Sequence, residues 1–147
     1  MSLYLEDLVV GTEYVSDEVE ITADDIIAFA SQFDPQPFHL DPDAAKSSFF
    51  GGLAASGWHT AALTMRLVVT GGPELAGGTI GGGGELAWPS PTRPGDRLHV
   101  RVTVKAVNPS RSNPARGSAV LRIETLTHDG ELRQLFTVRT LVFARPT

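Results

Sequence analysis

An apolar stretch with a single charged residue, Leu53 to Thr70, most limits the folds that this chain can adopt. Its alanines and leucines predict a helix that is buried on most of its faces. Four segments rich in β-branched residues follow, over residues 78–91, 96–107, 118–128 and 131–144. Asp129-Gly130, between the last two, is typical of a hairpin turn. The pattern therefore predicts an α+β fold in which an antiparallel sheet curls around one long helix.

The region before this helix predicts shorter elements. Residues 12–21 are typical of a short β segment, and Thr22 fits the N-cap of a helix whose apolar residues continue to Phe33. Asp41 and Pro42 have the cap and the first-turn proline of a second, short helix. We find no internal repeat and no linker, so we expect residues 1–147 to form a single domain.

Composition and charge exclude several classes of protein. A net charge of -5 argues against a general nucleic-acid surface, which needs clustered lysine and arginine. The absence of cysteine removes disulfides, thiolate nucleophiles and cysteine-ligated zinc. Residues 1–14 lack the basic region of a signal peptide, and no apolar run reaches the ~20 residues of a membrane span. We therefore expect a cytoplasmic protein with no nucleic-acid or membrane partner.

Asp34 and His39 are the residues that point to chemistry. They stand on either side of Pro35 and Pro37, which drive Asp34 and Gln36 out of the α-helical region. The result is a stiff, kinked strip that carries a carboxylate and an imidazole. Stiffness suits an acid–base pair, because a misplacement of ~1 Å can cost about 10²-fold in rate. Taken alone, the two residues also fit an ordinary loop at the end of a helix.

Three motifs in a fixed order give this strip a context. Residues 33–41, Phe-Asp-Pro-Gln-Pro-Phe-His-Leu-Asp, resemble the active-site strip of the MaoC-like dehydratases, the R-specific enoyl-CoA hydratase group. That strip usually reads Asp-x-Asn-Pro-[Leu/Ile]-His-x-Asp. Residues 50–57 match the family's aromatic-Gly-Gly-x-[Ile/Leu]-Ala-x-Gly stretch, and residues 91–96 match its Pro-x-x-x-Gly-Asp turn. The resemblance covers nearly the whole chain.

The resemblance implies the hotdog fold, with the active-site strip on a helical segment inserted ahead of the central helix. It also implies reversible addition of water to a 2-enoyl-CoA thioester, which gives an R-3-hydroxyacyl thioester. Asp34 and His39 carry over as the pair that activates water, and Gly57 as the residue whose backbone N–H polarises the thioester carbonyl. CoA enters only as part of the substrate, and no cofactor is expected. Asp34 is expected to be the main base, and either side chain can deliver the proton to the α-carbon.

Five residues near this trio are expected to contact the substrate: Gln36, Phe38, Ser56, Trp58 and His59. Several of them depart from the family's pattern. Gln36 replaces the usual Asn, Phe38 replaces an aliphatic residue, and Ser56 stands where His is frequent. These changes bear on the substrate more than on the reaction, because the acid–base pair is intact. Ser56 fits a helix cap equally well.

Two other functions are open on the same fold. An acyl-CoA thioesterase would aim a carboxylate at the thioester carbonyl, and a non-catalytic protein would only bind acyl thioesters. A metal centre is not expected, because the four histidines show no metal-ligand spacing. A sheet with one covered face and an open edge would be completed by a second copy, so we expect a homodimer or a larger homo-oligomer.

The glycine run from Gly81 to Gly84 resembles a phosphate-binding loop only superficially. Trp88 and Pro89 follow where the helix of such a loop must begin. The glycines are instead expected to let a strand pack closely against a helix or a partner, or to leave room for an acyl chain.

Overall fold

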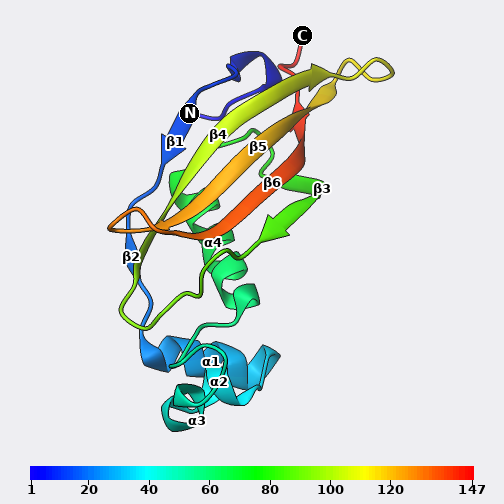
Figure 1. Ribbon diagram of the computed structural model, residues 1–147. Helices are drawn as coiled ribbons and strands as arrows, with labels where there is room; N and C mark the ends of the chain where they lie inside the picture. The colour runs from blue at the N-terminus through cyan, green and yellow to red at the C-terminus, as the bar shows by residue number, and fades with distance from the viewer.

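The computed structural model describes residues 1–147, with short elements first and long strands last (Figure 1). The elements in chain order are η1 (Leu5–Asp7), β1 (Glu13–Val15), β2 (Val19–Glu20), α1 (Ala23–Phe33), α2 (Pro37–Leu40), α3 (Pro42–Lys46), α4 (Gly57–Gly71), β3 (Ile80–Ala87), β4 (Arg97–Pro109), β5 (Arg116–Thr127) and β6 (Leu132–Phe143).

A six-stranded antiparallel sheet lies against α4. The strand order is β1-β4-β5-β6-β3, and β2 pairs with β4 along the same edge as β1. Alternate residues of β4 are buried, and Val100, Val102 and Val104 share the main core with Leu67 and Val68 of α4. This burial fits a strand with one face on a core and one face on solvent. The predicted α+β hotdog arrangement, a sheet around one long helix, is confirmed.

Helix α4 begins within the predicted apolar stretch, at the position that the Ser56 cap implies. Residues 53–56 run without regular structure, and the helix starts at Gly57 because the Ser56 hydroxyl accepts a hydrogen bond from the Trp58 N–H at 3.3 Å. The capping alternative for Ser56 is therefore confirmed.

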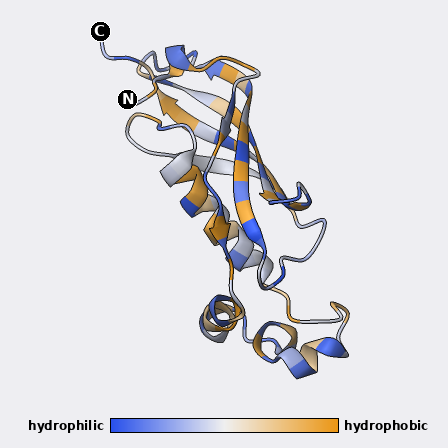
Figure 2. Ribbon diagram, turned by 90° about the vertical axis from the view of Figure 1, so that its left-hand side faces the viewer, coloured by the Kyte–Doolittle hydropathy of each residue, from blue (hydrophilic) through white to orange (hydrophobic).

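The burial of α4 is narrower than expected. Only one stripe of the helix faces the sheet, and its buried residues are Thr60, Thr64, Leu67 and Val68. On the opposite side Trp58, Met65 and Val69 are 61%, 40% and 56% exposed. Figure 2 shows the sheet on one side of the helix only. The prediction of burial on most faces is wrong for a single chain, because one sheet cannot enclose both sides.

Helices α1, α2 and α3 form the inserted segment below the sheet (Figure 1). Thr22 caps α1, and Asp41 caps α3 with Pro42 in its first turn, both as predicted. Asp25 adds the reciprocal bond of a capping box, which was not predicted. One helical turn was missed. Pro37–Leu40 form α2, since a proline fits the first turn of a helix. A second core joins this segment to the sheet, and its members are Ile21, Ile26, Ala45, Leu53, Ala55 and Leu98.

The glycine run lies in β3, the strand at one edge of the sheet. A Cβ at Gly84 would overlap the Thr137 carbonyl oxygen of β6, so within this chain the close packing at Gly84 is against the neighbouring strand and not against a helix. The register shifts between Gly81 and Gly83, and Gly83 has a φ of 139° that a side chain would strain. None of the helices is both long and apolar enough to cross a bilayer.

Candidate active site

The strip between α1 and α3 places a carboxylate and an imidazole side by side. Asp34 is the residue that ends α1, and its own N–H still donates to the Ala30 carbonyl. Gln36 is extended, as a residue before proline must be, and it precedes the single turn of α2 that carries His39. This local geometry brings the His39 Nε2 atom to 3.3 Å from an Asp34 carboxylate oxygen.

A hydrogen bond at the other ring nitrogen of His39, Nδ1, determines the tautomer of the imidazole. His39 Nδ1 lies 2.6 Å from the Ala54 carbonyl oxygen, in the segment that leads into α4. A carbonyl oxygen only accepts hydrogen bonds, so Nδ1 carries a hydrogen. Nε2 is then the nitrogen that takes up or releases a proton, and it is the one that faces Asp34. The ring is 5% exposed, and the edge of Phe38 packs against it.

Asp34 is surrounded by hydrogen-bond donors. Gln36 Nε2 donates to one carboxylate oxygen at 2.6 Å, and the Ser56 hydroxyl also lowers the pKa of the carboxyl group. Burial is the largest single influence on the pKa of Asp34 and acts to raise it. The hydrogen bonds from Ser56 and Gln36 and the electrostatic influence of His39 outweigh burial, so the pKa lies below its usual value. Asp34 is therefore an anion at neutral pH.

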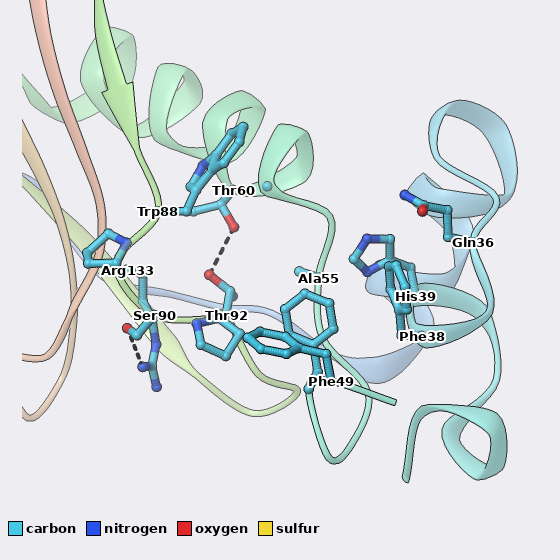
Figure 3. A pocket seen from close by; sticks show the side chains of 14 residues that line it. Gln36, Phe38, His39, Phe49, Ala55, Thr60, Trp88, Ser90, Thr92 and Arg133 are labelled. Atoms are coloured by element: carbon cyan, nitrogen blue, oxygen red, sulfur yellow. Dashed lines mark hydrogen bonds between the residues drawn. The ribbon is translucent and has the colours of Figure 1, made fainter. Parts of the chain in front are cut away.

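A cavity of about 510 Å³ opens beside this pair. His39, Gln36 and Phe38 line it from the inserted segment, and Gly57 lines it from the start of α4. Thr60 of α4 also lines it. The other wall comes from the sheet and the loop after β3, as Figure 3 shows, and its main residues are Trp88, Pro89, Ser90, Pro91, Thr92 and Arg133. Asp34 is not part of the lining, and its carboxylate lies against His39 Nε2.

Gly57 offers a free hydrogen-bond donor to this cavity. Its N–H is the first of α4, and no acceptor in the chain takes a hydrogen bond from it. The first N–H groups of a helix lack intrahelical partners and lie at the positive end of the helix dipole. The Trp88 ring covers the α-carbon, because a Cβ at Gly57 would lie 2.6 Å from ring atom Cε2. A carbonyl oxygen that gains negative charge would be stabilised at this N–H.

Three of the five expected substrate contacts, Ser56, Trp58 and His59, lie outside the cavity lining, and Ser56 is fully buried. Trp58 is largely exposed and packs edge-on against Trp88. His59 stacks on Phe29 with ring centroids 4.6 Å apart. Burial lowers the pKa of His59, and the Asp25 carboxylate offsets this only in part. A substrate contact by Trp58 or His59 stays a prediction.

The sequence reasoning missed most of the wall contributed by the sheet. Trp88 follows the glycine run and lines the cavity, where it is 41% exposed. Thr92 belongs to the Pro-x-x-x-Gly-Asp turn, and that motif could have marked it. No local signal marks Arg133, which reaches the cavity from β6. No group of three or more His, Asp or Glu side chains is arranged to hold a metal ion.

The chain is similar to several known proteins. It is 56% identical to the MaoC-like dehydratase from Rhodospirillum rubrum, whose crystal structure matches with a TM-score of 0.97 over 99% of this chain and 100% of that one. It is 34% identical to 3-hydroxybutyryl-CoA dehydratase of Methylorubrum extorquens over 111 residues, which are 74% of this chain and 68% of that protein. The (R)-hydratase from A. caviae involved in PHA biosynthesis is 26% identical, with a TM-score of 0.70 and coverage of 95% and 99%. The model of the MaoC-like domain matches residues 7–124, and the chain therefore belongs to the MaoC-like domain family.

Proposed function

We propose that this protein is a hydratase and dehydratase that interconverts a 2-enoyl-CoA thioester and an R-3-hydroxyacyl-CoA thioester. One observation carries the proposal. His39, whose Nε2 is paired with Asp34, and Gly57, whose N–H is free, line the same cavity. Hydration of a conjugated thioester needs a base for water, an acid for the α-carbon and a donor for the carbonyl oxygen.

In the proposed reaction the thioester carbonyl oxygen lies at the Gly57 N–H. Water binds beside Asp34 and His39 and loses a proton to this pair as its oxygen bonds to the β-carbon. The electrons of the double bond move toward the carbonyl, and the negative charge of the resulting enolate is held at the Gly57 N–H. Return of a proton to the α-carbon completes the addition of one water molecule. The same steps in reverse release water from the 3-hydroxyacyl thioester.

The identities of carrier and product rest on the relatives. CoA as carrier is supported by the named 3-hydroxybutyryl-CoA dehydratase, and the R configuration by the named (R)-hydratase. Membership of the MaoC-like domain family supports the reaction more broadly. No cofactor takes part in the proposed steps, since Asp34, His39 and Gly57 supply every group that the addition needs.

The proposal also includes the association of this chain with a second copy. Residues 58, 62, 65 and 69 form an exposed apolar stripe on α4, and they are Trp58, Ala62, Met65 and Val69. One edge of β3 pairs with β6, and no strand of the chain pairs with the other. Unpaired edges and apolar stripes are ordinarily covered by other elements or partners. We therefore propose at least a homodimer, with the cavity near the interface.

An assay with a short 2-enoyl-CoA tests the reaction. Loss of the absorbance of the conjugated thioester, without release of free thiol, is the expected result. Release of thiol would instead identify a thioesterase. Binding of the CoA ester with no loss of absorbance would identify a non-catalytic acyl-thioester-binding protein.

A further inference from the structure

We infer that Arg93 is a positioning residue for the active site. It lies in the loop between β3 and β4, outside the cavity lining. Its guanidinium donates to the carbonyl oxygens of Gly52 at 3.0 Å and Leu53 at 3.3 Å, and to the carbonyl of Phe50. The Arg93 side chain thus donates hydrogen bonds to three carbonyls of the segment that leads to the active site.

This segment continues directly into the groups of the proposed reaction. Ala54 follows Leu53, and its carbonyl oxygen holds His39 Nδ1 at 2.6 Å. The Ser56 hydroxyl helps to lower the pKa of Asp34 and caps α4, and Gly57 carries the free N–H. A shift of residues 50–53 would therefore move the imidazole, the carboxylate's donor and the oxyanion donor together. A misplacement of ~1 Å at such groups can cost about 10²-fold in rate.

The guanidinium is presented from a fixed turn. The Arg93 N–H donates to Asp96 at 2.8 Å, and the Asp96 N–H returns a bond to the Arg93 carbonyl at 3.1 Å. Asp96 is held in turn by Arg133 of β6 at 3.0 Å. The neighbouring residue reinforces the link, because the Thr92 carbonyl accepts a hydrogen bond from the Ala55 N–H at 2.9 Å. The sheet thereby fixes the position of the active-site segment through this turn.

Arginine is the side chain suited to this task. The partners of the Arg93 guanidinium are carbonyl oxygens, and no carboxylate lies within ion-pair distance of it. A planar fork with five donors can serve three carbonyls at once, whereas the ammonium group of lysine is a point charge on a flexible stem. Hydrogen bonds from a charged donor are also stronger than neutral ones.

Kinetics of Arg93→Ala and Arg93→Lys test this role, which for activity rests on the proposed function. We expect kcat to fall by ~10–100-fold in both variants while KM changes by less than about 3-fold, the pattern of a displaced reactive group. Ethylguanidinium should restore part of the kcat of Arg93→Ala. Arg122→Ala, an exposed arginine on β5 with no ion pair, is the control and should keep normal kinetics.

A rise in KM with unchanged kcat would instead make Arg93 a contact for the CoA phosphates and would overturn the inference. Normal kinetics in both Arg93 variants would overturn it too. If Arg93→Ala fails to fold, Arg93→Lys alone decides between these outcomes.

Amide hydrogen exchange provides a second readout that needs no activity. The Ala54 N–H donates to the Phe38 carbonyl at 3.1 Å, and the Ala55 N–H to Thr92. Both amides should exchange at least about 10-fold faster in Arg93→Ala if the segment loosens locally, with the strands unchanged. Unchanged exchange would contradict the inference even if the wild-type protein has no hydratase activity, so the two proposals fail independently.

Discussion

His39 presents one ring nitrogen to Asp34 at 3.3 Å while the other is held by a backbone carbonyl. Because the carbonyl oxygen accepts a hydrogen bond from Nδ1, that nitrogen keeps its hydrogen. Nε2, which faces the carboxylate, is then the nitrogen that can transfer a proton. Both side chains belong to a strip of six residues, but the carbonyl comes from Ala54. The acid–base pair is therefore assembled by two segments, and each can be tested separately.

Asp34→Asn and His39→Ala should each lower kcat/KM by ~10²–10⁴-fold, because each removes a group that transfers a proton. Both variants should stay folded, as judged by circular dichroism. Asp43→Asn is the matched control, since Asp43 is an exposed carboxylate that lines no cavity. Near-normal turnover by either active-site variant would remove that residue from the mechanism.

Gln36→Ala should shift the pH dependence of the reaction. The Gln36 amide helps to hold the pKa of Asp34 below its usual value, so its loss raises that pKa. The acid limb of the kcat/KM profile should then move to higher pH. Gln32→Ala, an exposed glutamine on α1, should leave the profile in place. An unmoved acid limb in Gln36→Ala would show that Asp34 does not set it.

Ser56→Ala and Thr22→Ala separate capping from catalysis. Each removes a helix N-cap, so each should lower the free energy of unfolding by about 1 kcal/mol. Of these two side chains, only Ser56 helps to lower the pKa of Asp34. Only Ser56→Ala should therefore raise that pKa and move the acid limb of the kcat/KM profile. Equal profiles for the two variants would contradict this assignment.

The lowered pKa of Asp34 also predicts how the stability of the protein depends on pH. A carboxyl whose pKa is lower in the folded than in the unfolded protein stabilises the fold above the unfolded pKa of ~3.9, and this stabilisation is lost as pH falls through the folded pKa. Ser56→Ala should lose part of this stabilisation, because the Ser56 hydroxyl helps to lower the pKa of Asp34. Its deficit in unfolding free energy should therefore be larger at neutral pH than at acid pH. Denaturant titrations at several pH values measure this difference.

The sequence predicted the parts of this structure that depend on local patterns. The cap at Thr22, the hairpin at Asp129-Gly130 and the alternation in β4 follow from residue types at fixed spacing, and all are present. The apolar pattern alone starts the helix at Leu53, because residues 53–56 are as apolar as α4, and only the possible cap at Ser56 indicates the start at Gly57. Tertiary hydrogen bonds of Leu53, Ala54 and Ala55 hold this segment out of the helix.

For the site, the strip and Gly57 could be identified from motifs, but their surroundings could not. Trp88 and Arg133 reach the cavity from β3's loop and from β6, tens of residues along the chain from the strip. Such contacts depend on strand register, which a single sequence determines poorly. The hydrogen bonds from Arg93 to three carbonyl groups could not be predicted either, because every residue has a backbone carbonyl whatever its type.

Gly57→Ala should destabilise the protein by ~1–3 kcal/mol, because the new methyl group would overlap the Trp88 ring. Activity should fall as well, since the start of α4 or the ring must move. Combining it with Trp88→Ala should cost less than the sum of the two single changes, because the overlap is gone. Additive costs in chemical denaturation would show that the two residues do not interact.

Met65→Glu should break the proposed dimer. Met65 lies in the exposed apolar stripe of α4, where a buried carboxylate would have no partner. Light scattering should give twice the mass of a single chain for the wild type and the mass of one chain for the variant. Val10→Glu, a change at an exposed residue before β1, should remain dimeric. A monomeric wild type would contradict the proposal.

Mass spectrometry of the product formed in water enriched in heavy oxygen tests the central claim most directly. The protein is incubated with a short 2-enoyl-CoA, and the position of the isotope is read from fragment ions. We predict an intact CoA thioester with one heavy oxygen, in the hydroxyl group on the β-carbon. Heavy oxygen in a free carboxylate, or no labelled product at all, would contradict the account.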